Sequence, residues 1–268
     1  MHNINQIFFQ EIFDFLSENE NIEIQLSEDI DKLIKALYTY VIYIDKLYDN
    51  EIQNAVFEDR NPLFELTQHY EYCILKLNEI FGNENELIDI KNNYLKIYFD
   101  ELIDEKKLAL EDVDFTYNRF KNLAINKHIP AYFVADCIFK LNNNYPLVQI
   151  KEMLSHLFIG IQLYDDVTDL REDLDNNQLT YAISNTIKYL KAENDYHKDN
   201  NAYTLKAFYA IEELSNPIFT KMIEEFEKAK EIALQYELSK IQNWIDIIIF
   251  QINEWKTQIE QIRNESYS

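Results

Sequence analysis

Apolar residues recur at helical spacing along most of the chain, and the clearest stripe lies in residues 150–161. The stripe consists of Ile150, Leu154, Phe158 and Ile161. The next positions on the same helix face carry Asp165, Asp169 and then Glu172 or Asp173. Ionised carboxylates on a buried face repel one another and lose hydration, which costs several kcal/mol unless a cation joins them. This pattern predicts a divalent metal with oxygen ligands, and the alternative is a solvated helix end.

A second helix shows the same change from apolar to acidic positions. Ser27 is expected to cap its N-terminus. Its apolar face carries Ile30, Ile34, Leu37 and Val41. Asp45 and Asp49 follow on that face, and aspartates at this spacing project from one side of a helix about 6 Å apart. Two such helices that face each other would form a bowl of carboxylates able to hold several Mg²⁺ ions.

The rest of the chain continues with helical patterns and few turn signals. Only two Gly and four Pro are present, so hairpins and Gly-rich phosphate loops have almost no sequence to form from. We expect an all-α fold, a single-domain bundle of about ten to eleven helices over residues 1–268, because no internal repeat or linker is visible. Pro62 and Gly82 are expected to begin and end one of these helices. Further helices are expected at about 4–18, 85–108, 112–126, 130–144, 146–177, 178–190, 202–214, 217–236 and 239–262.

Composition limits the partners and the compartment. The formal net charge of −23 argues against nucleic acid and anionic membrane surfaces, since both bind clustered cations. Cys73 and Cys137 lie far apart in helical segments and are expected to be buried free thiols. The N-terminus lacks the pattern of a secretory signal, and the longest apolar run, around 247–250, is too short to span a bilayer. We expect a cytoplasmic protein with no stable membrane span, and a homodimer is left open.

The sequence gives less support to a di-iron site or to a catalytic site built on histidine. Di-iron sites in helical bundles need a Glu followed three residues later by His, and the chain has no such pair. Glu152 and His156 are four residues apart. No Ser/His/Asp or Cys/His arrangement stands out among the five His.

The acidic part of the central helix has a recognisable order. It reads Q-x-x-D-D-x-x-D-x-x-x-D through Gln162, Asp165, Asp166, Asp169 and Asp173. This order resembles the second aspartate-rich motif of trans-prenyl diphosphate synthases, and the spacing of Gln162, Asp169 and Asp173 also resembles that of squalene and phytoene synthases. Asn-Asp…Ser…Glu, the form typical of terpene synthases, is absent.

Two further segments extend the resemblance. After the last Asp, squalene and phytoene synthases carry an Arg and an aromatic residue, where this chain has Gln178 and Tyr181. Asp45-Lys-Leu-Tyr-Asp49 resembles the first motif of both groups and fits the D-x-x-x-D form of the squalene branch better, since prenyl elongases carry Asp where this chain has Lys46.

All these families belong to the class I isoprenoid synthase superfamily. The resemblance implies an all-α fold with a central cavity, in which two acidic helices hold three Mg²⁺ ions that bind an allylic isoprenyl diphosphate and trigger its ionisation. Asp45, Asp49, Asp165 and Asp169 would be catalytic. The implied metal ligands are Asp45, Asp49, Asp165, Asp166, Asp169 and Asp173.

The resemblance also implies residues that hold the substrate, besides Gln162 and Tyr181. Lys127 falls where prenyl synthases carry a Lys-Thr pair, and Arg60 lies where elongases carry an Arg pair. Arg171 lies inside the second motif, and Arg119 precedes Lys127 on its helix. For each cation the alternative is a solvated or salt-bridged surface residue. Gly160 would either thin the helix so that substrate fits or allow close helix packing.

Cation content decides between the reactions of the superfamily. Elongases bind a second diphosphate in a basic pocket, but residues 1–44 contain no Arg and only Lys32 and Lys35. We therefore expect a class I terpene synthase, whose allylic cation cyclises, rearranges or loses a proton. The alternatives are a prenyltransferase of the squalene/phytoene or trans-polyprenyl diphosphate synthase type and, from another class, a non-catalytic helical interaction module.

Overall fold

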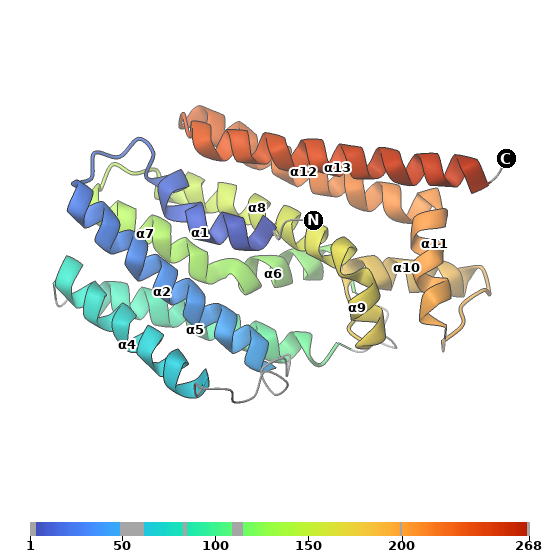
Figure 1. Ribbon diagram of the computed structural model, residues 1–268, viewed down its shortest axis with the longest axis horizontal. Helices are drawn as coiled ribbons and strands as arrows, with labels where there is room; N and C mark the ends of the chain where they lie inside the picture. The colour runs from blue at the N-terminus through green and yellow to red at the C-terminus, as the bar shows by residue number, and fades with distance from the viewer. Residues whose placement is uncertain (1–3, 49–61, 83–84, 109–114, 199, 267–268) are drawn as a thin grey trace. The chain divides into compact units, whose positions relative to one another are not determined.

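The computed structural model describes residues 4–48, 62–82, 85–108, 115–198 and 200–266 (Figure 1). Every element in these ranges is helical, which confirms the all-α prediction, and the number of helices is close to the ten or eleven expected. None of these helices is long and apolar enough to cross a membrane. Cys73 and Cys137 are buried free thiols, as the sequence predicts.

Contacts group the chain into two compact units. Unit 1 comprises residues 1–102 and 126–151, and unit 2 comprises residues 103–125 and 152–268. Neither unit is one continuous segment, because the chain passes from one to the other three times. The prediction of a single domain stays a prediction.

Unit 1 is built around the pair α2 and α4, which pack along each other. Its core includes the apolar face predicted for α2, since Ile30, Ile34 and Leu37 are buried. The helix begins at Ile24, so the prediction that Ser27 caps it is wrong. Gly82 follows α4 with φ of 72°, the left-handed conformation that a C-terminal glycine supplies. The elements are α1 (Ile4–Leu16), α2 (Ile24–Tyr48), α4 (Pro62–Phe81), α5 (Asn85–Glu105, its last residues in unit 2), the 3-10 helix η1 (Ile129–Ala131) and α7 (Tyr132–Leu141).

Unit 2 contains the acidic end of the central helix and the long pair α12 and α13, which run antiparallel (Figure 1). The predicted stripe on α8 is buried, but so are residues on its other faces, including Met153, Leu157 and Leu163. Every residue from Leu157 to Tyr164 is buried, so this part of α8 is more deeply enclosed than one stripe suggests. The elements are α6 (Tyr117–His128, its last residues in unit 1), α8 (Leu147–Thr168, its first residues in unit 1), α9 (Leu170–Asp175), α10 (Tyr181–Ala192), α11 (Asn201–Ala210), α12 (Glu212–Gln235) and α13 (Ser239–Ser266).

Several predicted boundaries in unit 2 are wrong, among them the end of the helix expected at 202–214, which stops at Ala210. The acidic helix is interrupted at Asp169 instead of running to residue 177, and α9 takes a new direction after it (Figure 1). Pro217 does not begin a helix but lies within α12, which starts at Glu212. Two glutamates in its first turn suit the positive end of the helix dipole. Pro217 lies beyond that turn, so its missing N–H removes the helical bond that would go to the carbonyl of Glu213.

Candidate functional site

The second motif occupies the end of α8 and the start of α9. Backbone N–H groups of Asp169 and Asp173 donate to the carbonyls of Asp165 and Asp169, each at 2.9 Å. These i to i+4 bonds close the last turn of α8 and the first turn of α9, so each neighbouring pair of aspartates keeps α-helical spacing although the two helices run in different directions. Asp165 and Asp173 are half-buried and Asp169 is exposed.

The carboxylate of Asp169 lies in an unfavourable electrostatic setting. Although the residue is exposed overall, partial desolvation raises the pKa of Asp169, and the negative charge of Glu172 raises it further. A hydrogen bond with Thr168 opposes both effects. A nearby cation would relieve this strain, since it favours the charged form of the carboxylate.

Asp166 has a different role from its neighbours in the motif. It is 4% exposed, and its two oxygens accept hydrogen bonds from Nε2 of Gln162 and from the backbone N–H of Tyr181, both at 3.0 Å. Tyr181 is the first residue of α10, so the carboxylate also lies at the positive end of that helix. Gln162 and Asp166 thus tie α8 to the start of α10, and metal binding by Asp166 stays a prediction.

The ring of Tyr181 is buried in an aromatic cluster. Its centroid lies 5.4 Å from that of Tyr117 and 5.2 Å from that of Phe120, both on α6. The structure therefore brings Gln162, Asp166 and Tyr181 together, as a shared site requires.

The first motif lies in unit 1, where Asp45 is half-buried near the end of α2. The hydroxyl of Tyr98 lies 3.3 Å from Oδ1 of Asp45 and belongs to a buried cluster with Leu102 and Ile129. Burial, together with the negative charge of Asp45, raises the pKa of Tyr38 on the same helix. The apolar face of α2 therefore leads to Asp45, as predicted. Asp49 lies outside the described residues.

The predicted cations are distributed over both units. Lys127 is half-buried in the last turn of α6 and belongs to unit 1, while Arg119 and Arg171 are exposed in unit 2. The guanidinium of Arg119 lies 5.6 Å from the ring centre of Phe115. Arg60 lies outside the described residues. Each substrate contact of these cations stays a prediction.

Acidic and histidine side chains do not gather in threes suitable for a metal ion anywhere in the described ranges. The donors of the second motif are nonetheless of the right kind for Mg²⁺, because carboxylate oxygens are the ligands that this ion takes in proteins.

Sequence reasoning missed a polar network centred on Glu225 of α12. This carboxylate is 4% exposed, and Oε2 lies 2.5 Å from Nδ1 of His156 on α8. Oε1 accepts from Nζ of Lys228 at 2.8 Å and from the hydroxyl of Tyr117 at 3.3 Å. Burial raises the pKa of Glu225, but the bonds to His156 and Lys228 outweigh it and lower the pKa to about 2. His156 and Glu225 are 69 residues apart, so no local pattern could reveal the pair.

Gly160 permits close packing of α8 on α12. A Cβ atom at this position would lie 3.0 Å from the ring of Phe226, closer than ordinary contact allows. The packing role named for this glycine therefore has direct support.

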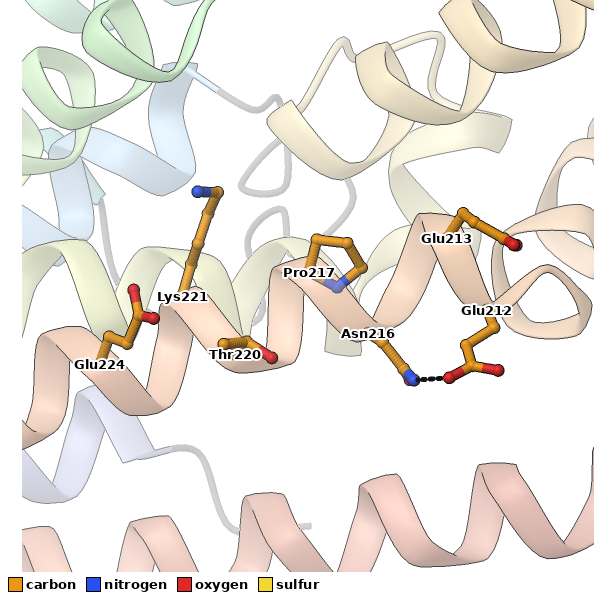
Figure 2. Close-up of a pocket in the computed structure, with 7 residues that line it drawn as sticks. All are labelled: Glu212, Glu213, Asn216, Pro217, Thr220, Lys221 and Glu224. Atoms are coloured by element: carbon orange, nitrogen blue, oxygen red, sulfur yellow. Dashed lines mark hydrogen bonds between the residues drawn. The ribbon is translucent and has the colours of Figure 1, made fainter.

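A solvent-open groove of about 560 Å³ follows α12 (Figure 2). Lys221 and Glu224 extend from one side of the helix, while Asn216 turns to the other side and donates to Glu212 at 2.8 Å (Figure 2). The lining residues are Glu212, Glu213, Asn216, Pro217, Thr220, Lys221 and Glu224.

No family model matches the chain, and no curated protein matches it. The resemblance to isoprenoid synthases therefore depends on the residues of the two motifs.

Proposed function

We propose that the protein is a magnesium-dependent class I isoprenoid synthase that ionises an allylic isoprenyl diphosphate, releases the diphosphate and lets the carbon skeleton cyclise or rearrange. The strongest support is the acidic end of α8. A buried apolar helix leads into Asp165, Asp169 and Asp173, which remain joined by helical backbone bonds. Desolvation and the charge of Glu172 raise the pKa of Asp169, and a nearby cation would favour its charged form.

The aspartates of the second motif would hold metal ions. When bound, Mg²⁺ stabilises the charge that builds on the oxygens of the departing diphosphate. Asp165, Asp169 and Asp173 would supply ligands from unit 2. Metal binding by Asp45 and Asp49 stays a prediction from the sequence. Asp166 and Gln162 would hold the start of α10, so that Tyr181 keeps its place beside the motif.

The decisive variants are Asp165→Asn and Asp169→Asn. Each should reduce magnesium-dependent release of diphosphate by at least about 100-fold, because a positioned charge contact of the transition state is lost. Helicity measured by circular dichroism should be unchanged. Asp175→Asn, an exposed position of α9 outside the motif, is the matched control and should retain activity. Full activity in either motif variant would exclude the assignment.

A prenyltransferase is the second candidate, and the D-x-x-x-D spacing of Asp45 and Asp49 favours its squalene branch. Incubation with geranyl, farnesyl and geranylgeranyl diphosphate, with and without isopentenyl diphosphate, separates the reactions. Hydrocarbons or alcohols formed without isopentenyl diphosphate support the synthase, provided that they are not joined dimers of the substrate. Joined dimers indicate the squalene branch, and longer diphosphates formed only with isopentenyl diphosphate indicate an elongase.

A further inference from the structure

The second motif continues from α8 into α9, a helix of only six residues. A helix this short has almost no stability of its own, because isolated helices become stable only at about 12–15 residues. Tertiary contacts therefore decide where α9 lies. Leu170 and Leu174 supply part of these contacts, since each is 2% exposed. Asp169 precedes α9 and Asp173 lies within it, so whatever holds this helix also places two of the three aspartates.

The neighbouring helix α11 packs against α9 and holds both of its ends through backbone carbonyls. At the interruption, the hydroxyl of Tyr209 donates to the carbonyl of Val167 at 3.2 Å. At the other end, Nδ2 of Asn201 donates to the carbonyl of Leu174 at 2.8 Å. Carbonyls in the last turn of a helix lack donors within that helix, so side chains of α11 bind groups that one continuous helix would satisfy itself.

Tyr209 is itself held by α13. Nε of Arg263 donates to the carbonyl of Tyr209 at 2.6 Å, and its guanidinium also donates to Ser215 and Asn216 near the start of α12. Arg263 is 9% exposed, and its positive charge suits the carbonyl end of α11. Burial raises the pKa of Tyr209 to about 12, so its hydroxyl remains a donor at neutral pH. The bond to Val167 thus comes from a residue whose backbone a buried guanidinium anchors.

We propose that Tyr209 and Asn201 are positioning residues that set the angle between α8 and α9 and so place Asp169 and Asp173 for magnesium binding. This role rests on the proposed function and adds α11 to the site. Both side chains act through the backbone carbonyls that they bind. Loss of either bond should let α9 move against α8, so that the aspartates are less often in the arrangement that binds an ion.

Hydrogen exchange followed by mass spectrometry tests these contacts without any metal. Tyr209→Phe keeps the ring and loses only the hydroxyl. In this variant and in Asn201→Ala, the amides of residues 169–175 should exchange about fivefold faster or more than in the wild type. Tyr203→Phe is the matched control, because Tyr203 is also a half-buried tyrosine of α11 but donates to Asp195. This control should leave exchange in α9 unchanged.

Magnesium binding separates positioning from a merely structural role. Thermal melts at increasing MgCl₂, with a fixed concentration of inorganic diphosphate, give the magnesium concentration for half of the maximal stabilisation. Tyr209→Phe and Asn201→Ala should each raise this concentration about fivefold or more, since loss of contacts that orient metal ligands weakens metal binding. Tyr203→Phe should leave it unchanged, because general destabilisation lowers the melting temperature at every magnesium concentration alike.

The possible outcomes distinguish a failure of this role from a failure of the proposed function. Unchanged exchange of residues 169–175 in both Tyr209→Phe and Asn201→Ala would overturn the positioning role. So would a magnesium response that Asp169→Asn removes but that both variants show at the wild-type magnesium concentration, and the magnesium site would then stand. A wild-type protein that responds to MgCl₂ no more than to NaCl at equal ionic strength would overturn the magnesium site and, with it, the role of α11.

Discussion

Lys91 of α5 places an ammonium group in the interior of unit 1. It is 1% exposed, donates to Oδ1 of Asn92 at 2.9 Å and lies 4.2 Å from the ring centre of Tyr70. Burial lowers the pKa of Lys91 to about 8, and the neighbouring Cys73 opposes the shift. The charged form is therefore held at a cost in stability.

Lys91→Met should stabilise the protein at neutral pH by up to about 3 kcal/mol. It should also remove the change of the unfolding free energy with pH that titration of Lys91 causes. In the unfolded chain the lysine has a pKa of about 10.4, so between about pH 8 and 10 the unfolded chain binds more protons than the folded protein. Stability of the wild-type protein should therefore rise across this range relative to the variant. Urea unfolding at several pH values measures it. Lys96→Met, an exposed position on the same helix, should show no such difference.

Gly160→Ala should destabilise the protein by about 1–3 kcal/mol, because the new methyl group meets the buried ring of Phe226. The gain in helix propensity, about 1 kcal/mol, offsets part of this. Urea unfolding of the single variants and of Gly160→Ala with Phe226→Leu gives a double-mutant cycle. The smaller side chain should relieve the clash, and strictly additive effects would contradict the packing role.

At the scale of elements, Glu225 joins three helices of unit 2 through one carboxylate. It receives Tyr117 from α6, faces His156 of α8 and pairs with Lys228 on its own helix. Together with the bond from Tyr181 to Asp166, this network holds α6, α8, α10 and α12 in register. The polar contacts of unit 2 thus link α8, which carries the first part of the second motif, with α6, α10 and α12.

Glu225→Gln should cost about 2–3 kcal/mol at neutral pH, because a buried network loses its negative charge and has one of its two acceptor oxygens replaced by an NH₂ donor. The pKa of Glu225 is about 2 in the folded protein and about 4.3 when unfolded, so its contribution is present above about pH 4.3 and is lost as pH falls toward 2. Unfolding free energies from neutral pH to pH 3 should therefore fall more steeply for the wild type than for the variant. If the unfolding free energies of wild type and variant fall in parallel with pH, Glu225 is not the source of this pH dependence.

At the scale of the whole molecule, the net charge of −23 sets an electrostatic cost on the compact state. Salt screens this repulsion, so the melting temperature should rise with added NaCl. A specific metal site adds a contribution that ionic strength alone does not give.

MgCl₂ should therefore raise the melting temperature more than NaCl at equal ionic strength, because an ion that binds only the folded state stabilises it. The excess should disappear in Asp165→Asn and Asp169→Asn and persist in Asp175→Asn. Thermal melts followed by circular dichroism measure it without any substrate. Equal curves for the two salts would argue against a magnesium site in the absence of diphosphate.

Local sequence patterns were enough to establish that the described chain is helical and to identify one buried face on α2 and on α8. Ile150, Leu154, Phe158 and Ile161 are all buried as their spacing predicts, because helical periodicity is a local property of the chain. The sequence also shows that the acidic residues follow this stripe. Identification of the motif as a catalytic site remains a prediction based on those residues.

Only the tertiary structure decided which side chains meet. Asp166 reads as one more aspartate of the motif, yet its oxygens bind Gln162 and the N-terminus of α10. His156 has a glutamate four residues away in sequence but pairs with Glu225. Such pairings depend on how distant helices pack, and side-chain spacing within one helix carries no information about the helix that will lie beside it.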